Sequence, residues 1–478
     1  MNLLLALLLL AAPTDPDLHR LETGGIIADI TVEDVNNSGR RDVVILAVDT
    51  SSEPPLRWLA VFLNDGEDRF PRLPSFTHAL SADAGGVFFA EKSGTAPREL
   101  VVVGQAGADV YGYSDNGWTH QSAPRFTSLY PAGFRFPRFL PQAATDLTGD
   151  GREEWIIPTT DGFTIHNGEE PLGVIPSAIG GYLQETDTPA SRMIYHIPEW
   201  KTFPVEGHAR KGLVFLGERH IQFATGADWG ETQRIPIPSP RGILDRTFNP
   251  VRRRDDRQPR PPGASAQTRI HDFTGNGLPD ILVMETEGGM NAQSVTALYF
   301  AQDVGFYPDE PDAIFERQGS FVQPSVADID GDDMPDLLFV EAPFGVRFLV
   351  NYFVRNRVTL RVEAYQNRNG RFGSSPDLST QVSLTTNDED RDQAFALGDF
   401  FGDDRMGAVF GNGDNRLAVF RGSETQLLES APVTTLDLSP YGIARAVRLC
   451  AQTTQDALLV YWPGERTDAV LVRFDPPA

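Results

Sequence analysis

The chain alternates short runs of apolar residues with loops rich in Asp, Asn, Gly and Pro. Runs such as Val43–Leu46, Leu213–Leu216 and Leu337–Val340 recur along it. Apolar runs this short, bounded by turn-forming residues, are typical of β-strands. The 44 glycines and 36 prolines suit many tight turns between such strands. The pattern therefore predicts an all-β protein.

One acidic motif recurs between these runs. Oxygen-bearing side chains stand at its first, third, fifth and ninth positions, and each copy leads into a strand-like run. Most copies also follow an apolar run, so the motif is interpreted as a loop joining two strands. A fifth copy, Asp399–Gly407, is degraded, because Phe401 and Gly407 replace two oxygen-bearing residues. The complete copies contain Asp34, Asn36, Ser38 and Asp42; Asp146, Thr148, Asp150 and Glu154; Asp272, Thr274, Asn276 and Asp280; and Asp328, Asp330, Asp332 and Asp336.

The spacing of the motif predicts the number of repeats. The first aspartates of successive copies lie 112, 126, 56 and 71 residues apart. The first two gaps are near twice the third, which predicts hidden repeats whose loops are degenerate. Candidates begin at Val87–Ala90 and at Arg192–Tyr195, and a last one begins at Ala446. The chain therefore holds eight slots.

A second feature recurs within the slots, a tight turn followed by an aromatic residue. Examples are Asn64–Gly66 with Phe70, and Asn369–Phe372. Asn-Gly and Asp-Gly sequences favour hairpins, here interpreted as joining a third and a fourth strand. Four short strands per unit predict a single β-propeller over residues 18–478. Eight blades are favoured, and seven remain possible if the last slot shares a blade with the N-terminal segment.

At this point the loops resemble a known family, the FG-GAP/VCBS repeats of integrin α-subunit heads and of bacterial surface proteins. The resemblance covers nearly the whole chain after its first residues, and Asp328–Asp336 is the most specific match. It implies a propeller of seven or eight blades. It also implies structural calcium ions that tie together two strands of one blade.

The residues themselves also favour calcium. Ca²⁺ takes six to eight oxygen ligands, and a loop with oxygens at positions 1, 3, 5 and 9 can wrap one ion. Asp, Asn and Gly make good turns without any metal. Four loops in the same oxygen register nevertheless indicate several structural Ca²⁺ ions. The four carboxylates of the Asp328–Asp336 loop predict the tightest of these sites.

Charge and compartment narrow the possible partners. The formal net charge is −25, and an acidic surface repels nucleic-acid phosphate and anionic lipid.

Cys450 is the single cysteine, so no intrachain disulfide can form. Residues 1–12 resemble a signal peptide, with a run of ten apolar residues that is shorter than the roughly 20 residues of a membrane span. We expect a secreted, periplasmic or cell-surface protein with no membrane span.

The motifs do not point to catalysis. The chain contains no nucleophile elbow, phosphate-binding glycine loop or zinc-protease motif, and calcium better explains the loop carboxylates. We expect a non-enzymatic module that binds a protein or a glycan. Two alternatives stay open. One is a structural subunit of a cell-envelope assembly, and the other is an extracellular carbohydrate-active enzyme such as a polysaccharide lyase or a quinone-dependent sugar dehydrogenase.

A charged, proline-rich stretch at about residues 250–264 is predicted to be a loop insertion between blades. Its arginines could anchor an acidic partner or a glycan, because guanidinium pairs well with carboxylate, sulfate or phosphate. The alternative is a loop that is merely solvated. The candidate contact residues are Arg252, Arg253, Arg254 and Arg257.

Overall fold

The computed structural model describes residues 16–92, 97–114, 117–130, 136–177, 179–184, 192–217, 219–244, 264–288, 292–318, 320–343, 345–386 and 393–475. The expected signal peptide at 1–12, and all but the last residue of the expected insertion at about 250–264, lie outside this range.

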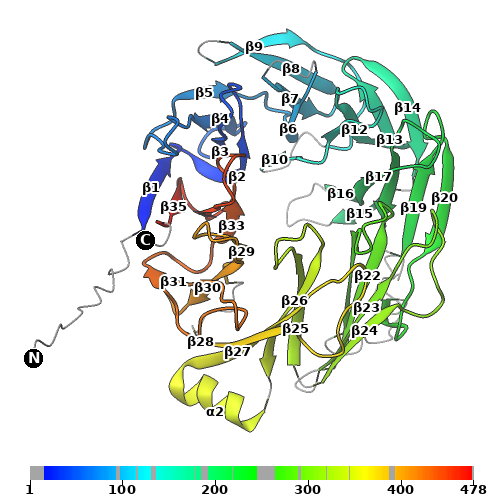
Figure 1. Cartoon of the computed structure of the whole chain (residues 1–478). Coiled ribbons are helices and arrows are strands. Elements are labelled where there is room, and N and C mark those ends of the chain that lie inside the picture. Colours follow the sequence, from blue (N-terminus) through cyan, green and yellow to red (C-terminus); the bar gives the residue numbers. More distant parts are fainter. Residues whose placement is uncertain are drawn as a thin grey trace, which may run out of the picture.

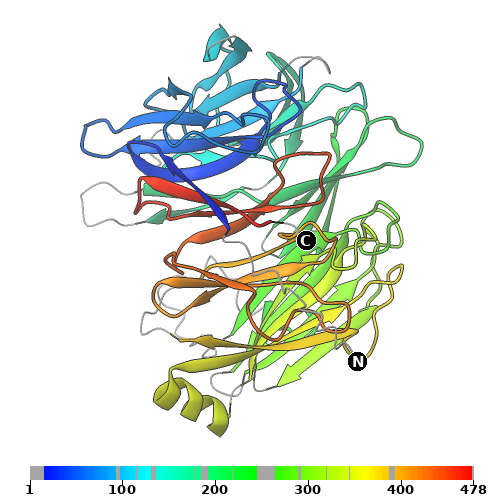
Figure 2. The same ribbon diagram turned by 60° about the vertical axis from the view of Figure 1, so that its left-hand side comes forward.

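The described strands form eight four-stranded antiparallel sheets, arranged as the blades of a ring (Figure 1). This confirms the prediction of an all-β, eight-bladed propeller. Within the described residues, the helix α2 (Val346–Arg355) and a two-stranded hairpin accompany the blades. In both views α2 projects from the ring near β27 and β28 (Figures 1 and 2).

The bounds of the strands follow the order of the blades. Blades 1 to 4 consist of β2 (Ile26–Glu33), β3 (Asp42–Asp49), β4 (Leu56–Phe62) and β5 (Phe76–Ala79); β6 (Gly86–Ala90), β7 (Glu99–Gly104), β8 (Gly107–Ser114) and β9 (Gly117–Ser122); β11 (Ala144–Thr145), β12 (Glu154–Thr159), β13 (Gly162–Asn167) and β14 (Glu170–Pro176); and β17 (Glu199–Phe203), β18 (Gly212–Leu216), β19 (His220–Thr225) and β20 (Glu231–Pro236). Blades 5 to 8 consist of β21 (Ser265–His271), β22 (Asp280–Glu287), β23 (Gln293–Tyr299) and β24 (Ala313–Gln318); β25 (Ser320–Ala327), β26 (Asp336–Pro343), β27 (Arg357–Tyr365) and β28 (Leu378–Thr385); β29 (Phe395–Gly398), β30 (Gly407–Asn412), β31 (Arg416–Phe420) and β32 (Thr434–Leu436); and β33 (Ile443–Val447), β34 (Ala457–Tyr461), β35 (Asp468–Arg473) and β1 (Asp17–Glu22). The short strand β10 (Arg138–Phe139) pairs in parallel with β6.

The core lies between the blades. Among the described residues, eight clusters of buried apolar side chains occur, one at each junction of neighbouring blades. In β3, Val43 and Ile45 pack toward blade 8, while Val44 and Leu46 pack toward blade 2. Successive side chains of a strand point to opposite faces, so a strand covered on both faces reads as a continuous apolar run. The apolar runs that follow the acidic motifs are therefore the second strands of their blades.

Blade 8 joins the two ends of the chain. Strand β1 pairs antiparallel with β35 from Asp17 opposite Arg473 to Glu22 opposite Asp468. The last slot thus shares its blade with the N-terminal segment, as the sequence allowed. The shared blade is nevertheless the eighth, so the count of seven is wrong.

One hidden repeat differs from its prediction. The run Arg192–Tyr195 was expected to be the first strand of its slot, but it belongs to β16 (Arg192–His196). This strand pairs with β15 (Gly180–Gln184) in a separate two-stranded hairpin. The first strand of blade 4 is β17, which follows β16 closely in the chain. A short apolar run does not reveal its pairing partner, which explains the error.

The antiparallel order of each blade divides its connections between two faces of the ring. Connections from first to second strands and from third to fourth strands lie on one face, here called the loop face. Connections from second to third strands lie on the opposite face, the linker face, and the links between blades begin and end there. The longest connections are three links between blades, residues 123–143, 177–198 and 237–264. No helix in the described part of the chain is long and apolar enough to cross a membrane.

Closure of the ring by β1 can be tested at Leu21. This side chain is fully buried in the apolar cluster between blades 8 and 1. Truncation to Leu21→Ala should lower the free energy of unfolding by about 2–5 kcal/mol, the usual cost of such a cavity. Leu18 of the same strand is 49% exposed, so Leu18→Ala is the matched control and should change little. Urea denaturation measures both, and equal effects would contradict the proposed role of β1.

Candidate functional site

The five acidic motifs all lie on the loop face, each between the first and second strands of a blade. They occupy residues 34–42, 146–154, 272–280, 328–336 and 399–407, and the last residue of each begins the second strand. The prediction that the motif joins two strands is confirmed. Blades 2 and 4, whose loops lack the motif, keep a connection of the same length, residues 91–98 and 204–211.

The first aspartate of each motif organises its own loop. Asp328 accepts hydrogen bonds from the backbone N–H groups of Gly331, Asp332 and Asp333, at 2.8, 3.2 and 3.0 Å. Positive φ angles at Gly331 (80°) and Asp333 (65°) turn these N–H groups inward. The first aspartates of the other four motifs accept equivalent bonds; they are Asp34, Asp146, Asp272 and Asp399.

The ninth residue of each complete motif is a fully buried acid. Asp280 accepts a hydrogen bond from the N–H of Phe273 in its own loop at 2.8 Å, and another from the N–H of Ala301 at 2.7 Å. Ala301 lies two residues after the third strand, so one carboxylate links the two loop-face connections of the blade. Asp42 and Asp336 make the same pair of bonds, and Glu154 makes the first of them.

Burial raises the pKa of Asp42, Asp280 and Asp336 to about 6, since an apolar surrounding disfavours the charged form. The hydrogen bonds from backbone N–H groups oppose this shift. Burial also raises the pKa of Glu154. The role of the ninth residues as calcium ligands stays a prediction, and in the fold their oxygens also join the acidic loop to the blade.

The Asp328 loop brings the carboxylates of its first, third and fifth residues together. One oxygen atom from each of Asp328, Asp330 and Asp332 lies within 4.8 Å of the others. Burial and the two neighbouring carboxylates raise the pKa of Asp330, as expected where like charges converge. No ion pair within the described residues neutralises this group. Three converging carboxylates are a donor set that fits Ca²⁺.

The third and fifth residues of the other complete motifs make contacts within their loops. The hydroxyl of Thr148 donates to Glu154 at 3.1 Å, and that of Thr274 lies 3.4 Å from an oxygen of Asp280. The side-chain oxygens of Asn36, Asp150 and Asn276 each accept the N–H of the residue two positions later, at 2.7–3.0 Å. The hydroxyl of Ser38 lies 3.4 Å from an oxygen of Asp34.

The degraded fifth loop contains a cation of its own. Arg421 forms an ion pair with Asp403 at 2.7 Å, and its guanidinium carbon lies 5.6 Å from the ring centre of Phe401. The guanidinium neutralises the carboxylate of the fifth residue, and its positive charge repels a metal cation. This geometry agrees with the preference for the four complete loops.

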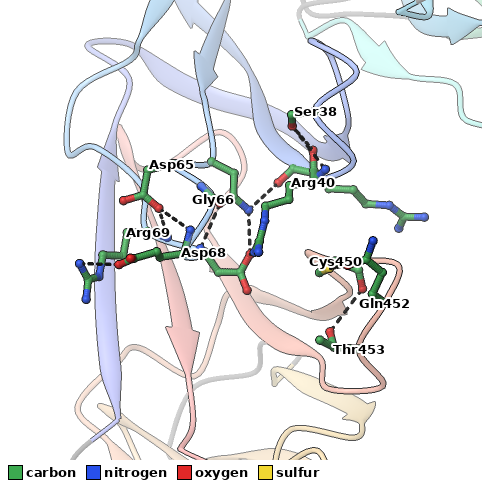
Figure 3. A network of polar contacts seen from close by, with 12 residues as sticks. Ser38, Arg40, Asp65, Gly66, Asp68, Arg69, Cys450, Gln452 and Thr453 are labelled. Carbon is green, nitrogen blue, oxygen red and sulfur yellow. Dashed lines mark hydrogen bonds and ion pairs between the residues drawn. The ribbon is translucent and has the colours of Figure 1, made fainter.

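The first loop also takes part in closing the ring. The guanidinium of Arg40 pairs with Asp68 in the adjacent turn of blade 1 at 3.1 Å (Figure 3). The backbone of Arg40 forms a bridge to Cys450 of blade 8, and the N–H of Arg41 donates to Leu449 at 2.8 Å. The loop is thus held both by its own blade and by blade 8.

The sequence pattern missed the role of Arg98 in blade 2. Its guanidinium contacts Glu33 of blade 1 at 3.0 Å and Glu153, which precedes β12 of blade 3, at 2.5 Å. Arg98 therefore links three consecutive blades on the loop face. Glu33 directly precedes the first residue of one acidic motif, and Glu153 directly precedes the last residue of another. This position beside the motifs was the only sign in the sequence that these acids belong to the loop face.

The predicted contact residues Arg252, Arg253, Arg254 and Arg257 lie outside the described residues. The segment that leads to them is described up to Leu244 and is tied to blade 5. Buried Glu285 of β22 accepts the N–H groups of Arg241 and Leu244, both at 2.7 Å.

No protein-family model and no curated protein matches this chain. Solved propellers are similar to it. A lectin of Agrocybe aegerita, described as recognising non-reducing terminal N-acetylglucosamine, has a TM-score of 0.41 and 14% identity, over 90% of this chain and 91% of that chain. BBS1N in complex with ARL6DN has a TM-score of 0.36 and 11% identity, over 95% of this chain and 94% of that chain. These likenesses concern the fold alone.

The role of the ninth residues can be tested at Asp280. The substitution Asp280→Ala leaves two buried N–H groups without an acceptor and should lower the free energy of unfolding by about 2–5 kcal/mol. The loss should persist in the presence of a calcium chelator, because these bonds need no metal. Asp414→Ala, at an exposed loop position, is the control. If the loss disappears in chelator, the residue acts through a metal instead.

Proposed function

We propose that this protein is an exported, calcium-stabilised β-propeller of the FG-GAP/VCBS type, which binds a protein or a glycan and does not catalyse a reaction. The observation that carries the proposal is the division of the ring into two faces. The acidic loops are short and each joins two strands of one blade on the loop face, whereas the longest links begin and end on the linker face. Loops on a rigid scaffold commonly carry recognition.

The Asp328 loop supports the calcium part of the proposal. Its three converging carboxylates would be the ligands contributed by the first, third and fifth positions. Bound Ca²⁺ would neutralise carboxylates that otherwise repel one another. The first aspartate already orders the turn through its backbone bonds, so the loop is shaped before the ion arrives.

The apolar run within residues 1–12 supports export. An extracellular location would also supply the millimolar calcium at which weak oxygen sites are filled. The absence of a catalytic role is proposed because the loop carboxylates have structural tasks. Those at the first and ninth positions accept backbone N–H groups, which leaves them poorly suited to exchange protons with a substrate.

The calcium proposal can be tested with two matched aspartates. Asp328 and Asp399 each accept three equivalent backbone N–H groups, so substitution by Ala costs each loop the same internal bonds. Wild type and Asp399→Ala should gain stability from calcium, about 2.7 kcal/mol per site at a hundredfold excess over Kd. Asp328→Ala should lose most of the increment of its own site.

Thermal melts in calcium and in chelator measure these increments. Superimposable wild-type melts would refute structural calcium. A larger loss of the increment in Asp399→Ala than in Asp328→Ala would show that the degraded loop, not the complete one, holds the metal.

The binding proposal can be tested at the basic insertion. Deleting residues 252–262 should leave folding and the calcium response intact, because these residues lie within a link between blades. If the arginines hold the partner, the deletion should weaken recovery of that partner from the native envelope. Replacing Arg252, Arg253, Arg254 and Arg257 by Gln keeps the length of the link and removes only its positive charges. This variant therefore distinguishes an effect of charge from an effect of loop length. Turnover of a polysaccharide or sugar by the wild type would refute the non-enzymatic reading.

A further inference from the structure

A groove of about 570 Å³ runs along the rim of the ring between blades 4 and 5. One wall is the end of β20 with the segment that follows it, and the other is the turn between β23 and β24 with the start of β24. Its lining is dominated by apolar residues and by five prolines, namely Pro236, Pro238, Pro240, Pro308 and Pro311.

Two large apolar side chains of this groove are open to solvent. Phe306 is 58% exposed and Ile314 is 52% exposed. Single exposed apolar residues are ordinary on a protein surface, but exposed apolar residues grouped in one concave place mark interaction sites. The groove therefore has the surface of a docking site.

Both walls are held in place by the fold. Buried Glu285 fixes the segment after β20 through Ser239 and through the N–H groups of Arg241 and Leu244. On the other wall, the hydroxyl of Tyr307 donates to the carbonyl of Pro279. Proline restricts the backbone further, so little conformational entropy would be lost when a ligand binds in this groove.

The groove has an acidic rim. Asp309 and Glu310 line it and are exposed. No Lys or Arg occurs between Arg269 and Arg317, and within the described part of the chain neither carboxylate forms an ion pair with a cation. The two carboxylates give this wall of the groove a negative charge, which favours a cationic ligand.

The lining suits a peptide better than a sugar. A glycan needs a dense set of hydrogen-bond donors and acceptors. Here the prolines have no N–H, and the hydroxyl of Tyr307 is already bonded. Aromatic and apolar walls instead match the rings of an extended proline-rich segment, which is ordered before it binds.

Resting on the proposed binding function, we propose that this groove docks an extended, proline-rich and arginine-bearing segment of a partner protein. Proline rings and aliphatic side chains pack against Phe306 and Ile314. The guanidinium groups pair with Asp309 and Glu310.

Fluorescence anisotropy with the full chain tests the proposal. The probe is a labelled twelve-residue peptide of Arg-Pro-Pro repeats. The controls are Glu-Pro-Pro repeats, which reverse the charge, and Arg-Gly-Ser repeats, which remove the proline conformation. The first peptide should bind at least about tenfold more tightly than either control at the same salt concentration. Equal binding of all three, or no binding of the first, overturns the proposal.

Variants locate the site. Phe306→Ala should weaken binding by about tenfold, as expected for an aromatic anchor. The double variant Asp309→Asn/Glu310→Gln should weaken it at low salt and flatten its salt dependence. Leu73→Ala, which removes a 64% exposed side chain on blade 1, and Asp414→Asn are matched controls and should have no effect. Unchanged affinity in the groove variants, with melting temperatures equal to wild type, overturns the proposal.

Other occupants have their own signatures. Tighter peptide binding after deletion of residues 252–262 would show that the chain's own basic segment competes for the groove. A dimer in sedimentation that Phe306→Ala dissolves would show that a second copy occupies it. Either result would overturn the proposal that a partner's peptide segment occupies the groove. If the native partner is still recovered by Phe306→Ala in the pull-down, only the groove is refuted; if wild type recovers no partner, the proposed function itself fails.

Discussion

The pairing of β1 with β35 is the constraint on which the ring depends. Each apolar layer of the core needs a blade on both sides. In a ring of eight blades, every apolar face is therefore covered only if blade 8 packs against blade 1. Strand β1 completes blade 8 with residues from the opposite end of the chain and contributes Leu21 to the closing layer. An open ring would expose a strand edge and two apolar faces to water. Closure therefore makes the eight layers mutually dependent.

Within this closed ring, buried acids hold the loop face in shape. Asp42 and Asp336 each accept one N–H of the acidic loop and Asp280 accepts two. All three also accept one N–H from beyond the third strand of the same blade. A buried charge is costly unless hydrogen bonds satisfy it, and here the backbone supplies them. Because one carboxylate serves two loops, neither loop can change length freely. Variation in length falls instead on the links between blades, which join scaffolds that are already rigid.

The acidic character of the protein thus divides into separate tasks. First-position aspartates order turns, ninth-position acids fasten loops to blades, and the carboxylates of Asp328, Asp330 and Asp332 converge. Other acids join blades, as Glu33 and Glu153 do through Arg98. Asp309 and Glu310 remain at the rim of an apolar groove. A net charge says little about function until each carboxylate is placed.

Local chemistry determined a large part of the fold. The acidic motif and the Asn-Gly turn encode their connections through nearby residues, so the sequence predicted the all-β class, the positions of the loops and the eight slots. What it could not determine was pairing at a distance. The run Arg192–Tyr195 has the composition of a blade strand, yet it forms a separate hairpin. The hydrogen bond that the N–H of Ala301 donates to Asp280 depends on how strands and blades pack, and so does the groove that brings Pro238 close to Phe306. Tertiary structure decided these features, because a side chain acquires such partners only when the ring has closed.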